Sequence, residues 1–182
     1  TVSVDAVRAK IDEAAKQATL QEPRGPDSLR SPHAWRIDAA EQLESQGRLQ
    51  EAVQVIVGQT PAGWNVLSAG DLTMVLETCD GGIRLLNLCD SQTRQRLVTE
   101  QPLPLFSLTL RSAQSKDQLR VHADSGWSRT QIAPAAPADP SAGIELRWEQ
   151  PTDSRLGNLR VVARAVPDGA AGEVVVTTFN MV

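Results

Sequence analysis

Residues 64–88 read WNVLSAGDLTMVLETCDGGIRLLNL, and this stretch decides the fold of the chain. Short apolar runs are separated by Ala-Gly-Asp and Asp-Gly-Gly, and turn residues between such runs are typical of antiparallel β-hairpins. We therefore expect three strands, Trp64–Ser68, Leu72–Thr78 and Ile83–Leu88. The close spacing of the runs favours meanders, because parallel crossovers need about a dozen connecting residues or more.

The same strand pattern covers most of the chain beyond residue 50. Successive side chains of a strand point to opposite faces, so in two of the runs one set is predicted to be buried and the other solvated. The predicted buried sets are Phe106, Leu108 and Leu110, and Ile144, Leu146 and Trp148. The further expected strands are Ala52–Val57, Leu105–Arg111, Gln118–Ala123, Ile144–Glu149, Leu159–Val166 and Glu173–Met181.

Two helices are predicted before the strands. Apolar residues recur at helical spacing from Val4 to Leu20, and this helix should end before Pro23, with residues 22–27 as a connector and hinge. Ser31 followed by Pro32 is typical of a helix start, and Gly47 can end the second helix. The expected fold class is α+β, with helices at about 4–20 and 32–46 packed on a mainly antiparallel β-sheet or sandwich.

The domain organisation follows from the length of 182 residues, which falls within the range of one domain. We expect a single domain over 1–182, with a helical N-terminal region at 1–50, a β-rich body at 51–182 and a Pro/Ala-rich surface loop at 132–143. Residues 39–52 resemble half of a helical-hairpin repeat, but repeat architectures need several copies and no second copy is present. We therefore assign strands from residue 51.

Composition and charge restrict the classes of partner. The 18 Lys and Arg residues against 22 Asp and Glu give a net charge of −4, and no basic block is present, so no nucleic-acid binding is expected. No stretch approaches the ~20 apolar residues of a membrane-spanning helix. Membrane contact is expected only through a segment outside this sequence.

The two cysteines, Cys79 and Cys89, allow two structures. A regular hairpin closed by Asp80-Gly81-Gly82 would place Cys89 about six residues up the returning strand, roughly 20 Å from Cys79. A disulfide needs Cα atoms closer than ~7 Å, so the hairpin and the bond exclude one another. We favour the disulfide, in which case Ile83–Leu88 would lie in a compact closed loop, for example as a short helix, instead of forming the strand given above; the alternative is a pair of free, buried thiols. A disulfide would indicate an oxidising compartment.

The residues typical of catalysis lack the neighbours that catalysis requires. His33 and His122 are expected to be surface histidines, because no nucleophile pattern accompanies either. Asp80-Gly81-Gly82 fits a turn better than a calcium loop. The acids Glu145, Glu149, Asp80 and Asp90 could supply a glycosidase pair, but solvated acids on a sheet face are far commoner. We expect no enzyme activity, no cofactor and no metal site.

The four tryptophans divide into two groups. Trp148 alternates with apolar residues and is expected in the core. Trp64 and Trp127 lie beside glycines and are expected to form the exposed pair that contacts a ligand or partner.

The order of an N-terminal helix, a connector, an antiparallel sheet and an expected disulfide resembles the soluble domains of pilin-like envelope subunits. The resemblance is one of layout, because no hydrophobic N-terminal segment is present in the sequence. It implies a non-catalytic assembly or interaction subunit of a bacterial-type cell envelope or of a secretion or pilus-like machinery. Other protein subunits are then the partners, in a homo- or hetero-oligomer, and the location is periplasmic or extracellular, with a cytoplasmic one as the alternative.

Two further questions stay open. The apolar stripe of Val4–Leu20 is suited either to lying on the sheet or to packing in a bundle with other chains. The alternative function is a ligand-binding β module that takes a carbohydrate or a small apolar ligand near Trp64 and Trp127.

Overall fold

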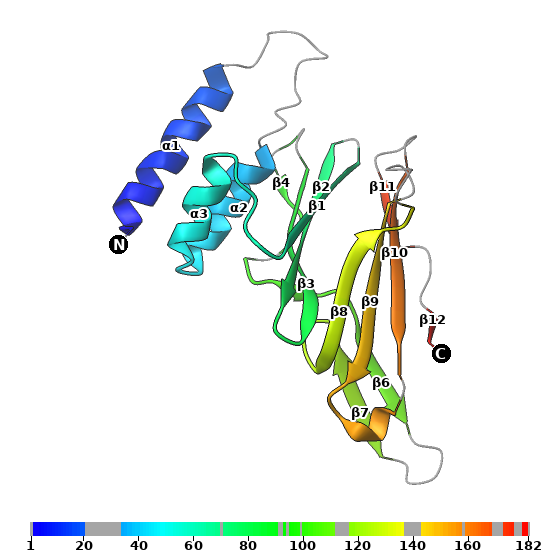
Figure 1. Cartoon of the computed structure of the whole chain (residues 1–182). Coiled ribbons are helices and arrows are strands. Elements are labelled where there is room, and N and C mark those ends of the chain that lie inside the picture. Colours follow the sequence, from blue (N-terminus) through cyan, green and yellow to red (C-terminus); the bar gives the residue numbers. More distant parts are fainter. Residues whose placement is uncertain are drawn as a thin grey trace. The chain divides into compact units, whose positions relative to one another are not determined.

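The computed structural model describes residues 2–20, 34–69, 71–90, 93, 95–98, 100–111, 117–136, 143–157, 159–168, 173–176 and 180–181. N-terminal helices are followed by antiparallel sheets, so the predicted α+β class is confirmed (Figure 1). The chain divides into two compact units. Unit 1 comprises Thr1–Val75 and Leu86–Pro102, and unit 2 comprises Leu76–Leu85 and Leu103–Val182.

Unit 1 begins with three helices, α1 (Val4–Leu20), α2 (Ala34–Ser45) and α3 (Leu49–Ile56). The first two match the predicted helices, whereas the expected strand Ala52–Val57 is wrong, because most of it lies in α3. Gly47, with a φ of 73°, ends α2, and the backbone N–H of Arg48 donates to the Leu43 carbonyl at 2.8 Å. The segment set aside as half a helical-hairpin repeat therefore forms one helical hairpin.

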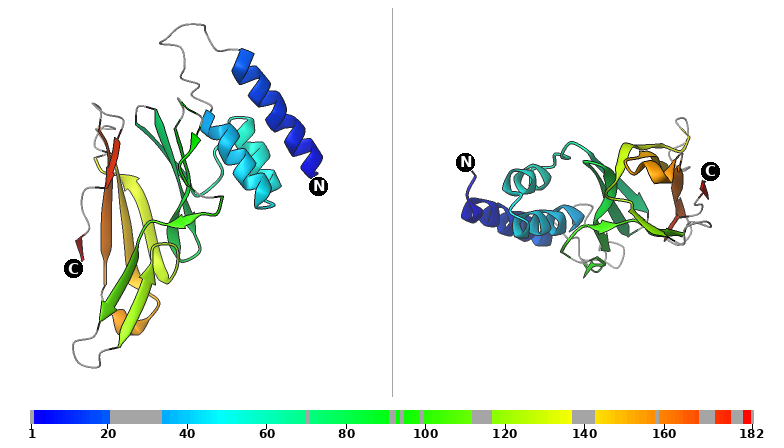
Figure 2. Two further views of the ribbon diagram at one scale, coloured as in Figure 1. Left: turned by 180° about the vertical axis from the view of Figure 1, so that it is seen from behind. Right: turned by 90° about the horizontal axis from the view of Figure 1, so that it is seen from below.

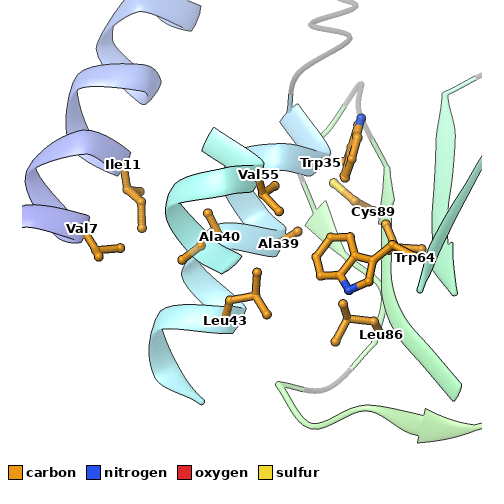
Figure 3. Close-up of a cluster of buried hydrophobic side chains, with 12 residues drawn as sticks. Val7, Ile11, Trp35, Ala39, Ala40, Leu43, Val55, Trp64, Leu86 and Cys89 are labelled. Carbon is orange, nitrogen blue, oxygen red and sulfur yellow. The ribbon is translucent and has the colours of Figure 1, made fainter. Parts of the chain in front are cut away.

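Helix α1 packs on this hairpin rather than on the sheet. Val7 is fully buried and Ile11 is 4% exposed, and both side chains point toward α2 and α3 (Figure 3). The Arg8 guanidinium pairs with Glu44 of α2 at 2.5 Å. Val4, at the start of the same stripe, is 43% exposed, so about two turns of α1 carry the apolar contact.

A four-stranded antiparallel path follows the helices, in the order β1 (Trp64–Ala69), β2 (Leu72–Cys79), β3 (Gly82–Asp90) and β4 (Gln95–Arg96). The boundary between the units runs across the β2–β3 hairpin, whose turn belongs to unit 2. Short strand β5 (Leu103–Pro104) also pairs with β3. The core of unit 1 joins helices to strands through Val7, Ile11, Trp35, Ala39, Ala40, Leu43, Ala52, Val55, Trp64, Val75, Leu86 and Cys89.

A buried polar network attaches α2 to β3 and β4. Gln42 is fully buried, and its amide nitrogen donates to the carbonyls of Leu86 at 2.7 Å and Glu100 at 3.0 Å. The amide nitrogen of Asn87, also fully buried, donates to Asp38 Oδ2 at 2.5 Å and to Gln42 Oε1 at 3.1 Å.

An ion pair completes this network. The Arg96 guanidinium of β4 lies 2.7 Å from Asp38 Oδ1. Burial alone would lower the pKa of Arg96, but the hydrogen bond and the charge of Asp38 outweigh it and raise that pKa. These hydrogen bonds and the ion pair connect α2 to β3 and β4, although the side-chain oxygen of Asn87 accepts no hydrogen bond within the described residues.

Unit 2 contains the remaining strands. β6 (Ser107–Arg111) and β7 (Gln118–His122) form a two-stranded sheet. A second sheet has the order β11 (Glu173–Val176), β10 (Val161–Asp168), β9 (Ile144–Pro151) and β8 (Trp127–Pro134), and β12 (Asn180–Met181) also pairs with β10 (Figure 2). A short 3₁₀ helix, η2 (Ser154–Leu156), follows β9.

Burial confirms the predicted faces of these strands in part, because Leu108, Leu110 and Ile144 are only half-buried. Leu146 and Trp148 are buried while their neighbours on β9 are partly or fully exposed, and Leu108 and Leu110 are more buried than Ser107 and Thr109. Phe106 meets Trp148 edge-on at 4.9 Å between ring centroids and Trp127 at 6.4 Å.

Several strand boundaries in unit 2 differ from the prediction, and two of the differences change the assignment of a segment. The expected loop at 132–143 is wrong at its start, because Ile132–Pro134 belong to β8; residues 137–142 lie outside the described part. Ala135 N–H donates to the Gly143 carbonyl at 2.9 Å, so β8 and β9 form a hairpin. The expected strand Glu173–Met181 is two short strands, with 177–179 outside the described residues.

Replacing Gly82 by Ala should destabilise the protein by about 3 kcal/mol, because overpacking against fixed backbone costs about that much. A Cβ at Gly82 would lie 2.2 Å from the Asp124 carbonyl carbon. Gly47→Ala is the comparison: a Cβ there meets nothing within 4 Å, so its positive φ of 73° should cost only about 1 kcal/mol. Urea denaturation measures both; equal losses would contradict the close approach at Gly82.

Replacing Asp38 by Ala should cost about 2 kcal/mol, because it leaves the partly buried Arg96 and the buried Asn87 without their shared acceptor. Glu41→Ala is the matched control on the same helix. Glu41 is 54% exposed and lies 3.9 Å from Arg96, so its removal should cost less than about 0.5 kcal/mol. A Glu41 variant as unstable as the Asp38 variant in thermal denaturation would show that the network is not the anchor of α2.

Candidate functional site

The turn between β2 and β3 packs closely on the connection between β7 and β8. Ile83 N–H donates to the Ala123 carbonyl at 2.8 Å, and Trp127 N–H donates to the Gly81 carbonyl at 3.1 Å. Trp148 Nε1 donates to the same Ala123 carbonyl at 2.7 Å, and Trp127 Nε1 donates to the His122 carbonyl at 2.8 Å. These bonds hold the turn against the aromatic core of unit 2.

An open pocket of about 660 Å³ lies beside this turn in unit 2. Most of its side chains carry hydroxyl or charged groups, and the hydroxyl of Thr152 donates to the Gly126 carbonyl at 3.2 Å. The lining residues are Cys79, Asp80, Gly81, Gly126, Trp127, Ser128, Arg129, Thr130 and Thr152. The site therefore offers both donors and acceptors to a polar ligand.

The two cysteines are free, so the predicted Cys79–Cys89 disulfide is wrong. The alternative of free thiols holds, although only Cys89 is buried. β2 ends at Cys79, Asp80-Gly81 forms the turn, and β3 continues to Asp90, which places Cys89 near the far end of the returning strand. Gly81 makes this turn possible with its φ of 84°, a conformation that side chains disfavour.

The two thiols have different surroundings. Cys89 is fully buried between Trp35 and Trp64 (Figure 3), and burial, with repulsion from Asp38 and Asp90, raises its pKa to about 11. Cys79 is half-buried, and its thiol donates to the Asp124 carbonyl at 3.4 Å. Burial also raises the pKa of Cys79. Both thiols are therefore protonated and poorly nucleophilic at neutral pH.

The predicted exposed pair of tryptophans is wrong. Trp64 is 7% exposed and belongs to the core of unit 1, whereas Trp127 is 2% exposed and belongs to the core of unit 2. Within the described residues no acceptor meets the buried Trp64 Nε1. Trp127 still lines the pocket together with Cys79. Trp64 and Cys89 instead lie together in the hydrophobic core of unit 1.

The other candidates from the sequence have structural partners. Glu145 pairs with Arg147 at 2.5 Å, and Glu149 pairs with Arg160 at 3.0 Å, so both acids are neutralised on the sheet face. Asp80 is an exposed turn residue at the pocket, and Asp90 accepts from the Thr93 backbone N–H at 3.2 Å.

The histidines add no recognised site. His122 is half-buried at the end of β7, and His33 lies outside the described residues. In the part of the chain that the structure covers, no three His, Cys, Asp or Glu side chains gather in a way that could hold a metal ion.

The outer edge of β1 is a second candidate site, in unit 1. β1 is the terminal strand of its sheet, and no further strand among the described residues pairs with its outer side. Its sequence, WNVLSA, contains no charged residue and no proline, and Val66 is 37% exposed. An uncharged edge of this kind is open to pairing with another chain.

Sequence reasoning located the pocket only in part. It named Asp80 and Trp127 but not Ser128, Arg129, Thr130 or Thr152, because Ser128–Gln131 shows no apolar alternation and was not assigned to a strand. For β1, the uncharged run between Gly63 and Gly70 was the available signal, since edge strands are normally protected by charge.

Comparison of the chain with protein-family models, curated proteins and solved structures gives no match. Among the described residues, no helix has both the length and the apolar character needed to cross a bilayer.

Alkylation of the native protein at about pH 8 should modify Cys79 slowly and leave Cys89 unmodified, because Cys89 is buried and has the higher pKa. In denaturant without reductant, mass spectrometry should find both thiols modified. The Cys89→Ser variant tests whether Cys79 is the thiol that reacts in the native protein. Its labelling under native conditions should equal that of the unchanged protein. A molecule that needs reductant before either thiol reacts would contradict the free cysteines.

Proposed function

We propose that this chain is a non-catalytic assembly subunit that joins another subunit by strand pairing along β1. The observation that carries the proposal is the uncharged outer edge of β1, with Val66 at 37% exposure. Strand addition to such an edge forms a row of main-chain hydrogen bonds, and alternate side chains supply the specificity. The buried face of the strand is fixed by Trp64, so the register of the edge is defined.

The edge strand β8 of the sheet formed by β8 to β11 differs from β1 in its chemistry. β8 is also a terminal strand, but it carries the exposed Arg129 and ends at Pro134, and both kinds of residue discourage edge pairing. The difference in chemistry between the two edges favours β1 as the assembly edge.

A second copy of this chain fits the β1 edge. Because WNVLSA carries no charge, two copies paired antiparallel would place no like charges opposite each other. Such a contact uses the same surface on both copies and closes as a two-fold dimer. An edge of six residues buries little area, so the association should be weak unless other surfaces add to it.

We also propose that the chain is a subunit of a bacterial-type envelope or of a pilus-like machinery, with a periplasmic or extracellular location. Its support is the layout of an N-terminal helix followed by antiparallel sheets. The free cysteines remove the argument from an oxidising compartment. A cytoplasmic assembly subunit with the same β1 edge is the alternative location.

A ligand-binding module is the second candidate function, favoured by the pocket beside Cys79 and Trp127. The hydroxyls of Ser128, Thr130 and Thr152 line it together with two charged side chains, Asp80 and Arg129. Such a lining fits a hydroxyl-rich ligand such as a carbohydrate better than a small apolar one. The buried ring of Trp127 leaves little surface for stacking on a sugar, and for this reason assembly stands first.

Replacing Val66 by Lys should abolish self-association, because a lysine on an edge strand opposes strand pairing. Analytical ultracentrifugation should show the native average mass rising above the 19.6 kDa of one chain between about 10 µM and 1 mM, the range of a small interface. The Val66 variant should stay at the mass of one chain.

Val57→Lys is the matched control for this change. Val57 is 54% exposed at the end of α3, where a cation is tolerated, so this variant should associate like the native protein. A native protein that remains monomeric over the whole range, or two variants with equal effects, would count against the assembly edge.

A further inference from the structure

The turn between β2 and β3 places an aspartate directly before a glycine. Asp80 is exposed, and Gly81 follows it with a φ of 84°. The side-chain carboxyl carbon of an aspartate and the backbone nitrogen of the next residue can join in a five-membered ring. A glycine in the second position favours this closure, because no side chain crowds its nitrogen and its backbone rotates freely.

The two groups that would react are both free. Within the described residues, no ion pair or hydrogen bond holds the Asp80 carboxylate. The Gly81 carbonyl accepts from the Trp127 N–H at 3.1 Å, whereas the Gly81 N–H donates to no turn or loop acceptor in the described part of the chain. Asp80 also lines the open pocket, so water reaches the turn.

Two other aspartates outside the strands lack this combination. The Asp153 carboxylate accepts from the backbone N–H of Arg155 at 3.0 Å and from its guanidinium at 2.6 Å, and these hydrogen bonds lower the pKa of Asp153. A fixed and ionised carboxylate is a poor target for attack. Asp124 is half-buried, and a serine follows both Asp124 and Asp153. Of these three residues, Asp80 alone combines a free carboxylate with a following glycine.

We propose that Asp80 is a site of spontaneous backbone isomerisation. The Gly81 nitrogen attacks the side-chain carboxyl carbon of Asp80, an N–C bond forms, and the carboxyl hydroxyl leaves with the amide proton as water. A water molecule then opens the cyclic imide at its main-chain carbonyl, which breaks the original bond between Asp80 and the Gly81 nitrogen. The main chain then runs through the Asp80 side chain as isoaspartate, and the water consumed balances the water released.

The isomer lengthens the main chain by one carbon where the packing is tight. A Cβ at Gly82 would lie 2.2 Å from the Asp124 carbonyl carbon, so the backbone there has no spare room. The longer turn cannot keep this close approach together with the hydrogen bond from Trp127 to Gly81. Isomerisation of Asp80 therefore weakens the attachment of the turn to the β7–β8 connection of unit 2 as the molecule ages.

The experiment incubates the full native chain for several weeks at about pH 6, where a small part of the aspartate carboxyl groups carries the proton that the leaving hydroxyl needs. Peptide mapping should then find a second form of the Asp80 peptide, equal in mass, separate in chromatography and resistant to an endoprotease that cuts before aspartate. The peptides of Asp124 and Asp153 should stay single. Asp168, the other aspartate that a glycine follows in the sequence, is mapped separately.

Asp80→Glu is the matched control. It keeps the charge of the exposed side chain, but its extra methylene requires a six-membered ring that closes far more slowly, so the second form should be lost. Asp80→Asn keeps the five-membered ring and releases ammonia instead of water, so the mass change from amide to acid counts its reaction. The Asp80→Asn chain should react at least as fast as the native one, and circular dichroism checks that both variants are folded.

A second measurement tests the structural consequence. The separated isomer should unfold at a lower urea concentration than the native chain, because its turn has lost contacts with unit 2. The Asp80→Glu chain should unfold at the native urea concentration, because the side chain of Asp80 is exposed.

Three results would overturn the proposal. Isoaspartate at Asp124 or Asp153 as early as at Asp80 would show that the turn does not select the site. An Asp80→Asn chain that keeps its mass while native, but releases ammonia in urea, would show that the folded turn blocks the attack. An isomer as stable as the native chain would show that the lengthened turn has no effect on the structure.

Discussion

The hairpin of β2 and β3 is the element on which the core of each unit depends. At its open end, Leu86 and Cys89 join the helices and Trp64 in the core of unit 1. At its closed end, Gly81 and Ile83 bond to the β7–β8 connection of unit 2. The approach of Gly82 to Asp124 leaves no room for a side chain, so the turn requires glycine there. One hairpin thus supplies strands to two hydrophobic cores.

The β1 edge provides main-chain hydrogen-bonding groups and no charge. Pairing there therefore depends on hydrogen bonds and on the side chain of Val66.

Much of the fold could be predicted from the sequence where the pattern was strong. Helix α1 and the more buried sides of β6 and β9 follow from periodicity alone. The β2–β3 hairpin follows from its strand and turn pattern, but the favoured Cys79–Cys89 disulfide excluded it. Helix α3 was missed because Val53 and Val55 were read at strand-like spacing, although Leu49, Ala52, Val53 and Ile56 recur at helical spacing. β8 was missed because an edge strand with exposed Ser128 and Arg129 lacks the apolar alternation of a buried strand. The pocket was harder to predict than the fold. Cys79 and Trp127 come together because Gly81 lies close to Gly126, and hydrophobic periodicity gives no information about such a contact.

The path of the chain through β2 and β3 also limits how the protein can be divided. Unit 1 takes residues from both sides of Leu76–Leu85, and unit 2 takes that same insert together with everything after Pro102. No single peptide bond therefore separates the units: a cut between Val75 and Leu76 removes Leu86 from the helices, and a cut after Pro102 removes the hairpin tip from the aromatic core. A fragment that begins or ends inside Leu76–Pro102 therefore lacks residues of at least one unit.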